Sequence, residues 1–277
     1  MTDFAGKVAW VAGAARRPGI GRAAAVQLAR RGADVACVDV VTATPEDADS
    51  YRVSQDALDA TAAAVEAEGR RALSLAVELT DPDAVDASIA TTVDAFGRVD
   101  VCCNLSGGTG PRLGNGALLR IEPESWTAAL HANLTAVWLG ARSCARRMVE
   151  QGDGGAIVSL SSSAGVMGEP GFGAFSAARG GVLRLTEVLA TELAPHRIRA
   201  NAVCPLGVSP RAGGGNPGLE HGAARRQGNL DEWVRATIPL GRMQDPDETA
   251  AVIVFLASDG ASFVSGQAIT VAGGAHV

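Results

Sequence analysis

A glycine-rich turn near the N-terminus constrains the fold of this chain more than any other feature. It joins an apolar run, residues 7–12, to a helix-like segment, residues 22–31. In this order, backbone N–H groups and the helix N-terminus can face a diphosphate. A second apolar run, residues 34–38, follows and ends in Asp39, and this context predicts a parallel α/β sheet that binds a dinucleotide. We expect the turn to contact the cofactor through Gly13, Arg17, Gly19, Ile20 and Gly21.

Asp39 lies eighteen residues after Gly21, where a carboxylate can accept hydrogen bonds from the adenosine ribose. A carboxylate at this place repels a 2′-phosphate, so NAD is favoured as the cofactor over NADP. The alternative for Asp39 is a plain turn residue at a strand end. Arg16 and Arg17 also leave two alternatives open: they lie in solvent, or they contact a phosphate.

Apolar runs and helix-like segments alternate along the 277 residues. This predicts one α/β domain over residues 1–277, a Rossmann-like, doubly wound parallel sheet with helices on both faces. Two segments fall outside the alternation. The polar segment at about 42–55, which holds the only tyrosine, Tyr51, is predicted to be an insertion. The glycine-rich segment at about 206–236 is predicted to be a substrate lid, with Glu220 and His221 near its mouth.

Composition excludes several classes of partner. There are 24 basic and 30 acidic side chains, and no basic stripe, so we expect no nucleic-acid partner. No apolar window approaches the ~18–20 residues that span a bilayer, and the N-terminus does not resemble a signal peptide, so we expect no membrane and a cytoplasmic location. The five cysteines lie in strand-like or helix-like runs, which suits buried reduced thiols. Cys102 and Cys103 should point to opposite faces of one strand, and no metal site is expected.

The segment 156–182 resembles a known active site. An apolar run ends in three serines, and a helix begins near Phe175 after a loop rich in Gly and Pro. The segment is similar to the active-site strand and helix of the short-chain dehydrogenase/reductase family, where a Ser precedes a Tyr by thirteen residues and a Lys follows the Tyr by four. Ser162 and Arg179 stand at these spacings from Phe175. The chain therefore has Phe and Arg where the family has Tyr and Lys.

The resemblance covers essentially the whole chain and implies roles for further residues. The segment 133–138 resembles the family's Asn-x-x-Gly helix segment, whose Asn bends the helix around a water that feeds the catalytic Lys; the alternative is that Asn133 lies on the surface. Glu78 stands where a family carboxylate meets the adenine amino group. The residues that the resemblance places along the cofactor are Glu78, Leu79, Asn104, Ser106, Gly107, Arg179, Pro205, Gly207 and Val208.

The chain departs from the family pattern at other places too. The turn glycines lie at relative positions 0, 6 and 8 instead of 0, 4 and 6, a loop length seen in the divergent enoyl reductases of the family. Leu105 and Ser106 replace the second Asn and the Ala of the Asn-Asn-Ala-Gly turn. Leu206 takes the place of a Gly that lets the backbone approach the nicotinamide, and Gly207 follows one residue late, so this loop must differ locally.

The substitutions remove part of the family's chemistry. In the family, the Tyr hydroxyl gives a proton to the carbonyl oxygen, and its loss should cost ~10²–10⁴-fold in rate. Arg179 can still hydrogen-bond a ribose, but a guanidinium holds its proton too firmly to relay protons as Lys does. Ser162 keeps its hydroxyl, which can polarise a carbonyl.

Three functions remain open on this basis. The first is an NAD(H)-dependent oxidoreductase for a small to medium, mostly apolar carbonyl, alcohol or enone substrate, with the proton supplied by water, the substrate, Ser162 or His221. The second is a non-redox catalyst on the same fold: a cyclase, isomerase, dehydratase or lyase. The third is a nucleotide-binding pseudoenzyme, and an engineered Phe175 is a further alternative. The family pairs through helices equivalent to residues 124–151 and 175–193, which implies a homo-oligomer, dimer or tetramer.

Overall fold

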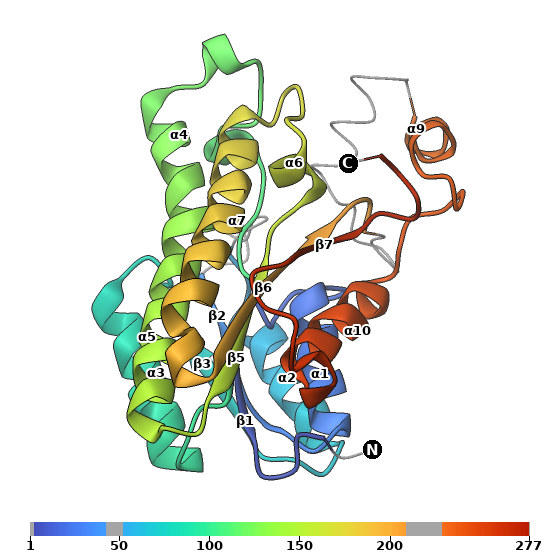
Figure 1. Cartoon of the computed structure of the whole chain (residues 1–277). Coiled ribbons are helices and arrows are strands. Elements are labelled where there is room, and N and C mark those ends of the chain that lie inside the picture. Colours follow the sequence, from blue (N-terminus) through green and yellow to red (C-terminus); the bar gives the residue numbers. More distant parts are fainter. Residues whose placement is uncertain (1–2, 43–51, 209–228, 277) are drawn as a thin grey trace.

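The computed structural model describes residues 3–42, 52–208 and 229–276. Seven parallel strands form one sheet in the order β3-β2-β1-β4-β5-β6-β7. The single-domain, Rossmann-like fold predicted from the sequence is confirmed (Figure 1). The strands are β1 (Val8–Ala12), β2 (Asp34–Asp39), β3 (Ala72–Ala76), β4 (Val101–Asn104), β5 (Gly155–Leu160), β6 (Ile198–Pro205) and β7 (Ala268–Val271).

Helices cover both faces of the sheet, and a separate apolar core lies beneath each set (Figure 1). Cys103 belongs to one of these two cores and Cys102 to the other, so the two neighbouring side chains do point to opposite faces of the sheet. All five cysteines are buried and unpaired. One face carries α1 (Ile20–Arg30), α2 (Gln55–Glu66) and α10 (Pro246–Ala257); the other carries α3 (Pro82–Phe96), α5 (Ala136–Gln151) and α7 (Gly173–Leu193).

The boundaries of the strands and helices predicted above agree with the structure to within two residues except in three places. The single helix predicted over 124–151 is α4 (Pro123–Leu130), a π-helical turn (His131–Thr135) and α5. A four-residue helix, α6 (Ser163–Val166), lies in the predicted loop before α7, and α9 (Leu230–Thr237) lies at the end of the predicted lid. Residues 209–228 of that lid, with Glu220 and His221, and residues 43–51 of the 42–55 insertion lie outside the described residues.

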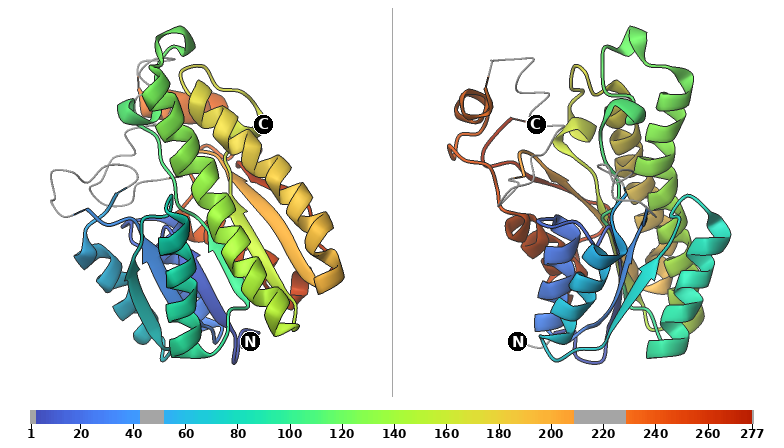
Figure 2. Two further views of the ribbon diagram at one scale, coloured as in Figure 1. Left: turned by 90° about the vertical axis from the view of Figure 1, so that its left-hand side faces the viewer. Right: turned by 180° about the vertical axis from the view of Figure 1, so that it is seen from behind.

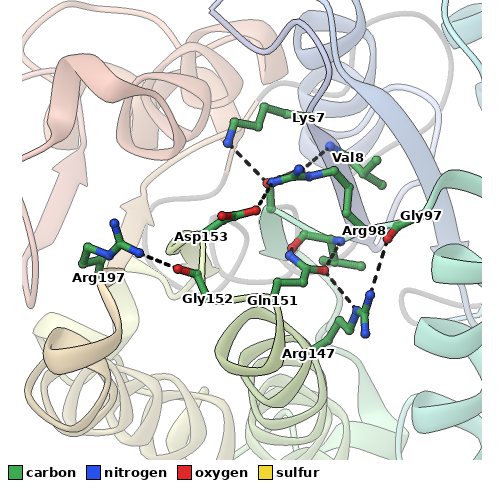
Figure 3. Close-up of polar contacts among 11 residues, drawn as sticks. Lys7, Val8, Gly97, Arg98, Arg147, Gln151, Gly152, Asp153 and Arg197 are labelled. Carbon is green, nitrogen blue, oxygen red and sulfur yellow. Dashed lines mark hydrogen bonds and ion pairs between the residues drawn. The ribbon is translucent and has the colours of Figure 1, made fainter.

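Ion pairs and hydrogen bonds link the residues at the edge of the sheet where the strands begin (Figure 3). The Asp100 carboxylate accepts hydrogen bonds from the Val8 backbone N–H at 2.9 Å and from Arg98 at 2.6 and 2.8 Å. Gln151, at the end of α5, pairs both of its amide atoms with the Val99 backbone at 2.8 Å. These contacts tie the starts of β1 and β4 to α5, so the polar groups of this edge satisfy one another.

No helix within the described ranges is long and apolar enough to cross a membrane.

Candidate active site

The residues singled out from the sequence gather at the carboxyl ends of the strands, where β1 and β4 are neighbours. Strand order reverses between these two strands, and ligands of open α/β sheets bind at such a point. Gly13 follows β1 with φ +83°, and a side-chain carbon at its position would lie 2.6 Å from the backbone nitrogen of Ser106, which follows β4. Only glycine fits this close approach. The glycine-rich turn and the end of β4 therefore form one continuous surface.

Helix α1 begins directly behind the glycine-rich turn and presents an open N-terminus. Its N-cap is Gly19, no side chain caps it, and its first turn contains no acidic residue. The first N–H groups of a helix have no partner inside the helix, and the helix dipole favours negative charge there. This end of α1 thus fits a diphosphate, as the sequence predicted.

Asp39 is 3% exposed at the end of β2 and holds the glycine-rich turn in place. Its carboxylate accepts hydrogen bonds from the Ala15 N–H at 2.8 Å and from the Val40 N–H at 2.9 Å. Burial raises the pKa of Asp39 to about 6, and these N–H groups and the charge of Arg16 act in the opposite direction. The turn and the predicted ribose acceptor are therefore one rigid unit.

Three other predicted cofactor contacts lie at the margin of this unit. The exposed Arg17 donates to the Ala60 carbonyl of α2 at 3.2 Å, so its guanidinium points toward α2. Glu78 lies after β3, where it accepts from the Thr80 hydroxyl at 2.6 Å and pairs with Arg52 at 3.7 Å. The Leu79 side chain is buried in the core under α3, which leaves only its backbone for a ligand.

Arg179 is the central charged group of the site and is 3% exposed. Its Nη1 donates to the Leu160 carbonyl at 2.5 Å, and its Nη2 donates to the Ser106 carbonyl at 3.3 Å. Within the described part of the chain, its Nε has no hydrogen-bond partner, nor has the hydroxyl of Ser106. Burial lowers the pKa of Arg179 to about 10, so the guanidinium stays charged at neutral pH. The site thus holds a buried cation and two polar groups that a ligand could satisfy.

The ring of Phe175 packs on Arg179 one helical turn earlier in α7. The central carbon of the guanidinium lies 5.2 Å from the ring centre, a cation–π contact. Phe172 packs edge-on against Phe175 with ring centres 6.3 Å apart. Phe175 has no ionisable proton, so the position at which the family pattern has its acid is apolar here.

Ser162 lies at the start of α6 and is partly exposed. Its oxygen accepts from the Ala164 N–H at 3.2 Å, which leaves the hydroxyl proton free to be donated. Two residues that the sequence reading missed hold this part of the site: Ser161 donates to the Arg179 backbone carbonyl at 2.8 Å, and Gly165 lets α6 approach the Arg179 backbone closely. The run of three serines was the only signal for Ser161.

Asn133 is fully buried in the π-helical turn, so the surface alternative for it is wrong. Its side-chain oxygen accepts from the Gly108 N–H, and its amide nitrogen donates to the Gly108 carbonyl and the Ala129 carbonyl, each at 3.0 Å. His131, two residues earlier, is exposed as expected. Asn133 therefore fixes the turn that follows β4, next to Gly107 and Arg179.

Asn104, at the end of β4, pairs its backbone with β1 and β5, while its side-chain amide has no hydrogen-bond partner and faces Gly140 of α5. The segment 108–116, which follows the turn after β4, contains a short helical turn (Pro111–Leu113), and its Gly116 N–H donates to the Gly171 carbonyl at 2.9 Å.

The loop after β6 differs from the family pattern as the sequence predicted. The positive φ of +63° falls on Gly207, and the Leu206 side chain packs with Trp233 and Ile238. Gln244 holds the loop with two hydrogen bonds. Its side-chain Nε2 donates to the Leu206 carbonyl at 2.9 Å, and its backbone N–H donates to the Gly207 carbonyl at 2.9 Å. Pro205 ends the strand and Val208 pairs with Gln244, so Leu206 points into an apolar cluster with α9.

These features together fit a dinucleotide. The open end of α1 suits a diphosphate, and the unpartnered polar groups of Arg179 and Ser106 suit the hydroxyls of a ribose. Within the described residues, no cluster of three or more metal-ligating side chains occurs.

Comparison with known proteins agrees with this geometry. The family model described as enoyl-(acyl carrier protein) reductase matches residues 13–276. A 3-oxoacyl-[acyl-carrier-protein] reductase of Synechocystis is 36% identical over 276 residues, which cover 99% of this chain and 98% of that protein. An uncharacterised NAD-dependent oxidoreductase of Mycobacterium tuberculosis is 34% identical, with 98% of this chain and 96% of that protein covered.

Solved structures resemble this one along its whole length. Carveol dehydrogenase of Mycobacterium avium in complex with NAD has a TM-score of 0.89 at 30% identity, with 99% of each chain covered. NAD⁺-bound xylitol dehydrogenase has a TM-score of 0.85 at 28% identity, with 98% of this chain and 99% of that chain covered.

Proposed function

The chain belongs to the short-chain dehydrogenase/reductase family, and we propose that it is an NAD(H)-dependent oxidoreductase that lacks the usual tyrosine acid. The proposed substrate is a small to medium, mostly apolar carbonyl, alcohol or enone compound. One contact supports this most directly: the Ser106 backbone touches the glycine-rich turn through Gly13 and accepts a hydrogen bond from Arg179. The part of the chain that would hold a diphosphate and the part that would hold a ribose are thus joined.

We assign the cofactor contacts on the observed geometry. Gly13, Gly19, Gly21 and the open end of α1 would take the diphosphate, and Asp39 the adenosine ribose. Arg179 and Ser106 would take the nicotinamide ribose. When bound, the reduced cofactor supplies the hydride that a carbonyl carbon receives.

The carbonyl oxygen must then receive a proton, and Phe175, at the position where the family has a phenol, has none to give. The free hydroxyl proton of Ser162 can donate a hydrogen bond to that oxygen, and the Arg179 charge favours the developing oxyanion. We propose that water supplies the proton itself. This route is slower than transfer from a placed acid by ~10²–10⁴-fold, so we expect low turnover on simple ketones.

The apolar ring at Phe175 also favours a second candidate function, a non-redox reaction on the same fold such as elimination or isomerisation. Such a reaction needs no proton donor at this position. It would form product without any change in NADH absorbance.

The test is a titration followed by a substrate screen. Purified protein is titrated with NADH and NAD⁺ by calorimetry, and any nucleotide that co-purifies is identified by mass spectrometry. Carbonyl compounds are then screened by NADH absorbance and, in parallel, by product analysis. Oxidation of NADH with product supports the oxidoreductase, and product alone supports the second candidate. Binding without any product indicates a pseudoenzyme, and no binding of either nucleotide removes the proposal.

We further propose that the protein works in the cytoplasm as a homo-oligomer. The long helices α5 and α7 lie side by side on one outer face (Figure 2). They expose the apolar side chains of Trp138 and Val188, which suits packing against a second copy.

A further inference from the structure

Arg179 is a buried positive charge that no carboxylate among the described residues neutralises. Its two donated hydrogen bonds end on backbone carbonyls, which carry no net charge. The one ionisable group that raises its pKa is the Cys204 thiol, and burial raises the pKa of that thiol, so it is neutral. Among the described residues, the positive charge of Arg179 therefore has no opposite charge beside it at neutral pH.

The substitution at Phe175 is the reason that the charge stays unbalanced. An ionisable phenol at this position could become negative beside the cation, whereas a bare ring offers only its quadrupole. A cation–π contact is worth ~0.5–2 kcal/mol, much less than a desolvated ion pair. The Phe175 ring at 5.2 Å therefore stabilises the guanidinium without cancelling its charge.

An unbalanced cation discriminates between the two redox forms of a nicotinamide. The oxidised ring carries a positive charge and the reduced ring carries none, while the rest of the cofactor is the same. For two unit charges separated by roughly 6–10 Å at an effective dielectric constant of ~20, repulsion changes a binding constant by about 10- to 100-fold. Arg179 keeps its proton at neutral pH, so this repulsion persists there.

We propose that Arg179 determines the redox state of the cofactor that this protein holds: it makes the site bind NADH in preference to NAD⁺, and so favours reduction. This inference rests on the proposed NAD(H) site. It assigns to Arg179 a charge-selecting role in addition to its hydrogen bonds. The hydrogen bonds act equally on both forms, and the charge acts only on the oxidised form.

The experiment measures the ratio of the dissociation constants of NAD⁺ and NADH by calorimetry in four proteins. These are the wild type, Arg179→Met, Arg179→Lys and Arg184→Met, the last a control on α7 whose side chain is 73% exposed. We expect a ratio above ~10 in the wild type, a fall of about tenfold or more in Arg179→Met, and little change in the other two. Thermal unfolding checks that each variant is folded.

A second variant keeps the test decisive if Arg179→Met does not fold. Phe175→Glu places a carboxylate four residues before Arg179 on the same helix face, where the two side chains meet. It should tighten NAD⁺ binding relative to NADH, whereas Phe175→Leu should not. Equal loss of both redox forms in Arg179→Met, or a wild-type ratio near one, overturns the inference and leaves the proposed function standing. Absence of binding to either form overturns the proposed function itself.

Discussion

The guanidinium of Arg179 lies 5.2 Å from the centre of the Phe175 ring, and it bridges the carbonyls of Leu160 and Ser106 at the ends of β5 and β4. The ring thus packs on a cation that is already fixed by backbone from two strands. A phenol in place of this ring would sit next to a permanent positive charge, which lowers the pKa of a phenol. The bare ring of Phe175 offers no such acid at this position.

Restoring that acid should raise turnover. Phe175→Tyr together with Arg179→Lys supplies both a proton donor and a group that can relay protons, so we expect a gain of ~10²–10⁴-fold in kcat on generic ketones. The measurement is NADH oxidation at saturating cofactor. Phe172→Tyr, which adds the same hydroxyl to the neighbouring ring, is the control and should give no gain. If the double variant binds NADH but stays inactive, the Leu206 loop, rather than the missing acid, is what blocks the reaction.

The Asn133 side chain should stabilise the folded protein by holding the Gly108 backbone in place. Asn133→Ala removes three hydrogen bonds of 3.0 Å from a fully buried side chain and leaves the Gly108 backbone unpaired. We expect a loss of ~2–3 kcal/mol in the free energy of unfolding and faster hydrogen exchange at the Gly108 amide. Urea denaturation and exchange mass spectrometry measure these effects. Unchanged exchange at residues 106–109 would show that other contacts hold this turn.

Most of the fold follows from the sequence because its signals are local. Apolar runs such as residues 34–38 and 156–160 match the buried strands β2 and β5, and the Asp81-Pro82 pair caps the start of α3. These patterns depend on residues within a few positions of each other. They also placed Gly13 and Asp39 on one edge of the sheet.

The parts that the sequence did not predict depend on distant partners. The resemblance implied a bend at Asn133, but the Gly108 backbone that its side chain holds lies 25 residues away and was not predicted. The acceptors of Arg179 come from the ends of β4 and β5, and only the packing of α7 brings them together. Helix α6 is four residues long, too short to leave a periodic pattern. Local patterns carry no information on such contacts.

The pH dependence of stability should reveal the buried carboxylate of Asp39. Burial raises its pKa in the folded protein to about 6 from the ordinary 3.8. As the pH falls from about 6 to about 4, the folded protein binds a proton that the unfolded chain does not, so this group adds up to about 3 kcal/mol of stability. That gain is lost as the pH rises again through 6.

Urea unfolding of the cofactor-free protein between pH 4.5 and 7.5 measures this effect. The wild type should gain stability relative to Asp39→Asn as the pH falls, because Asn does not titrate. Asp153→Asn, at a carboxylate whose side chain is 58% exposed, is the control and should follow the wild type. If the free energies of unfolding of the wild type and Asp39→Asn change with pH in parallel, the pKa of Asp39 is not raised in the folded protein.

The exposed apolar side chains of α5 and α7 should lie in the interface between copies of the chain. Trp138 is 44% exposed and Val188 is 51% exposed, and single large apolar side chains of this kind on adjacent helices suit a self-complementary surface. We expect Trp138→Glu with Val188→Glu to lower the assembly mass by at least half, because four buried charges would face one another across a two-fold axis. Sedimentation velocity measures the mass.

A second variant, Phe263→Glu, separates the two possible assemblies. The ring of Phe263 follows α10 and is fully exposed. The variant should leave a dimer intact, whereas a tetramer that also uses this end of the molecule would fall to a dimer. A double variant with the wild-type mass, or a wild type that is already a monomer, would contradict the predicted interface.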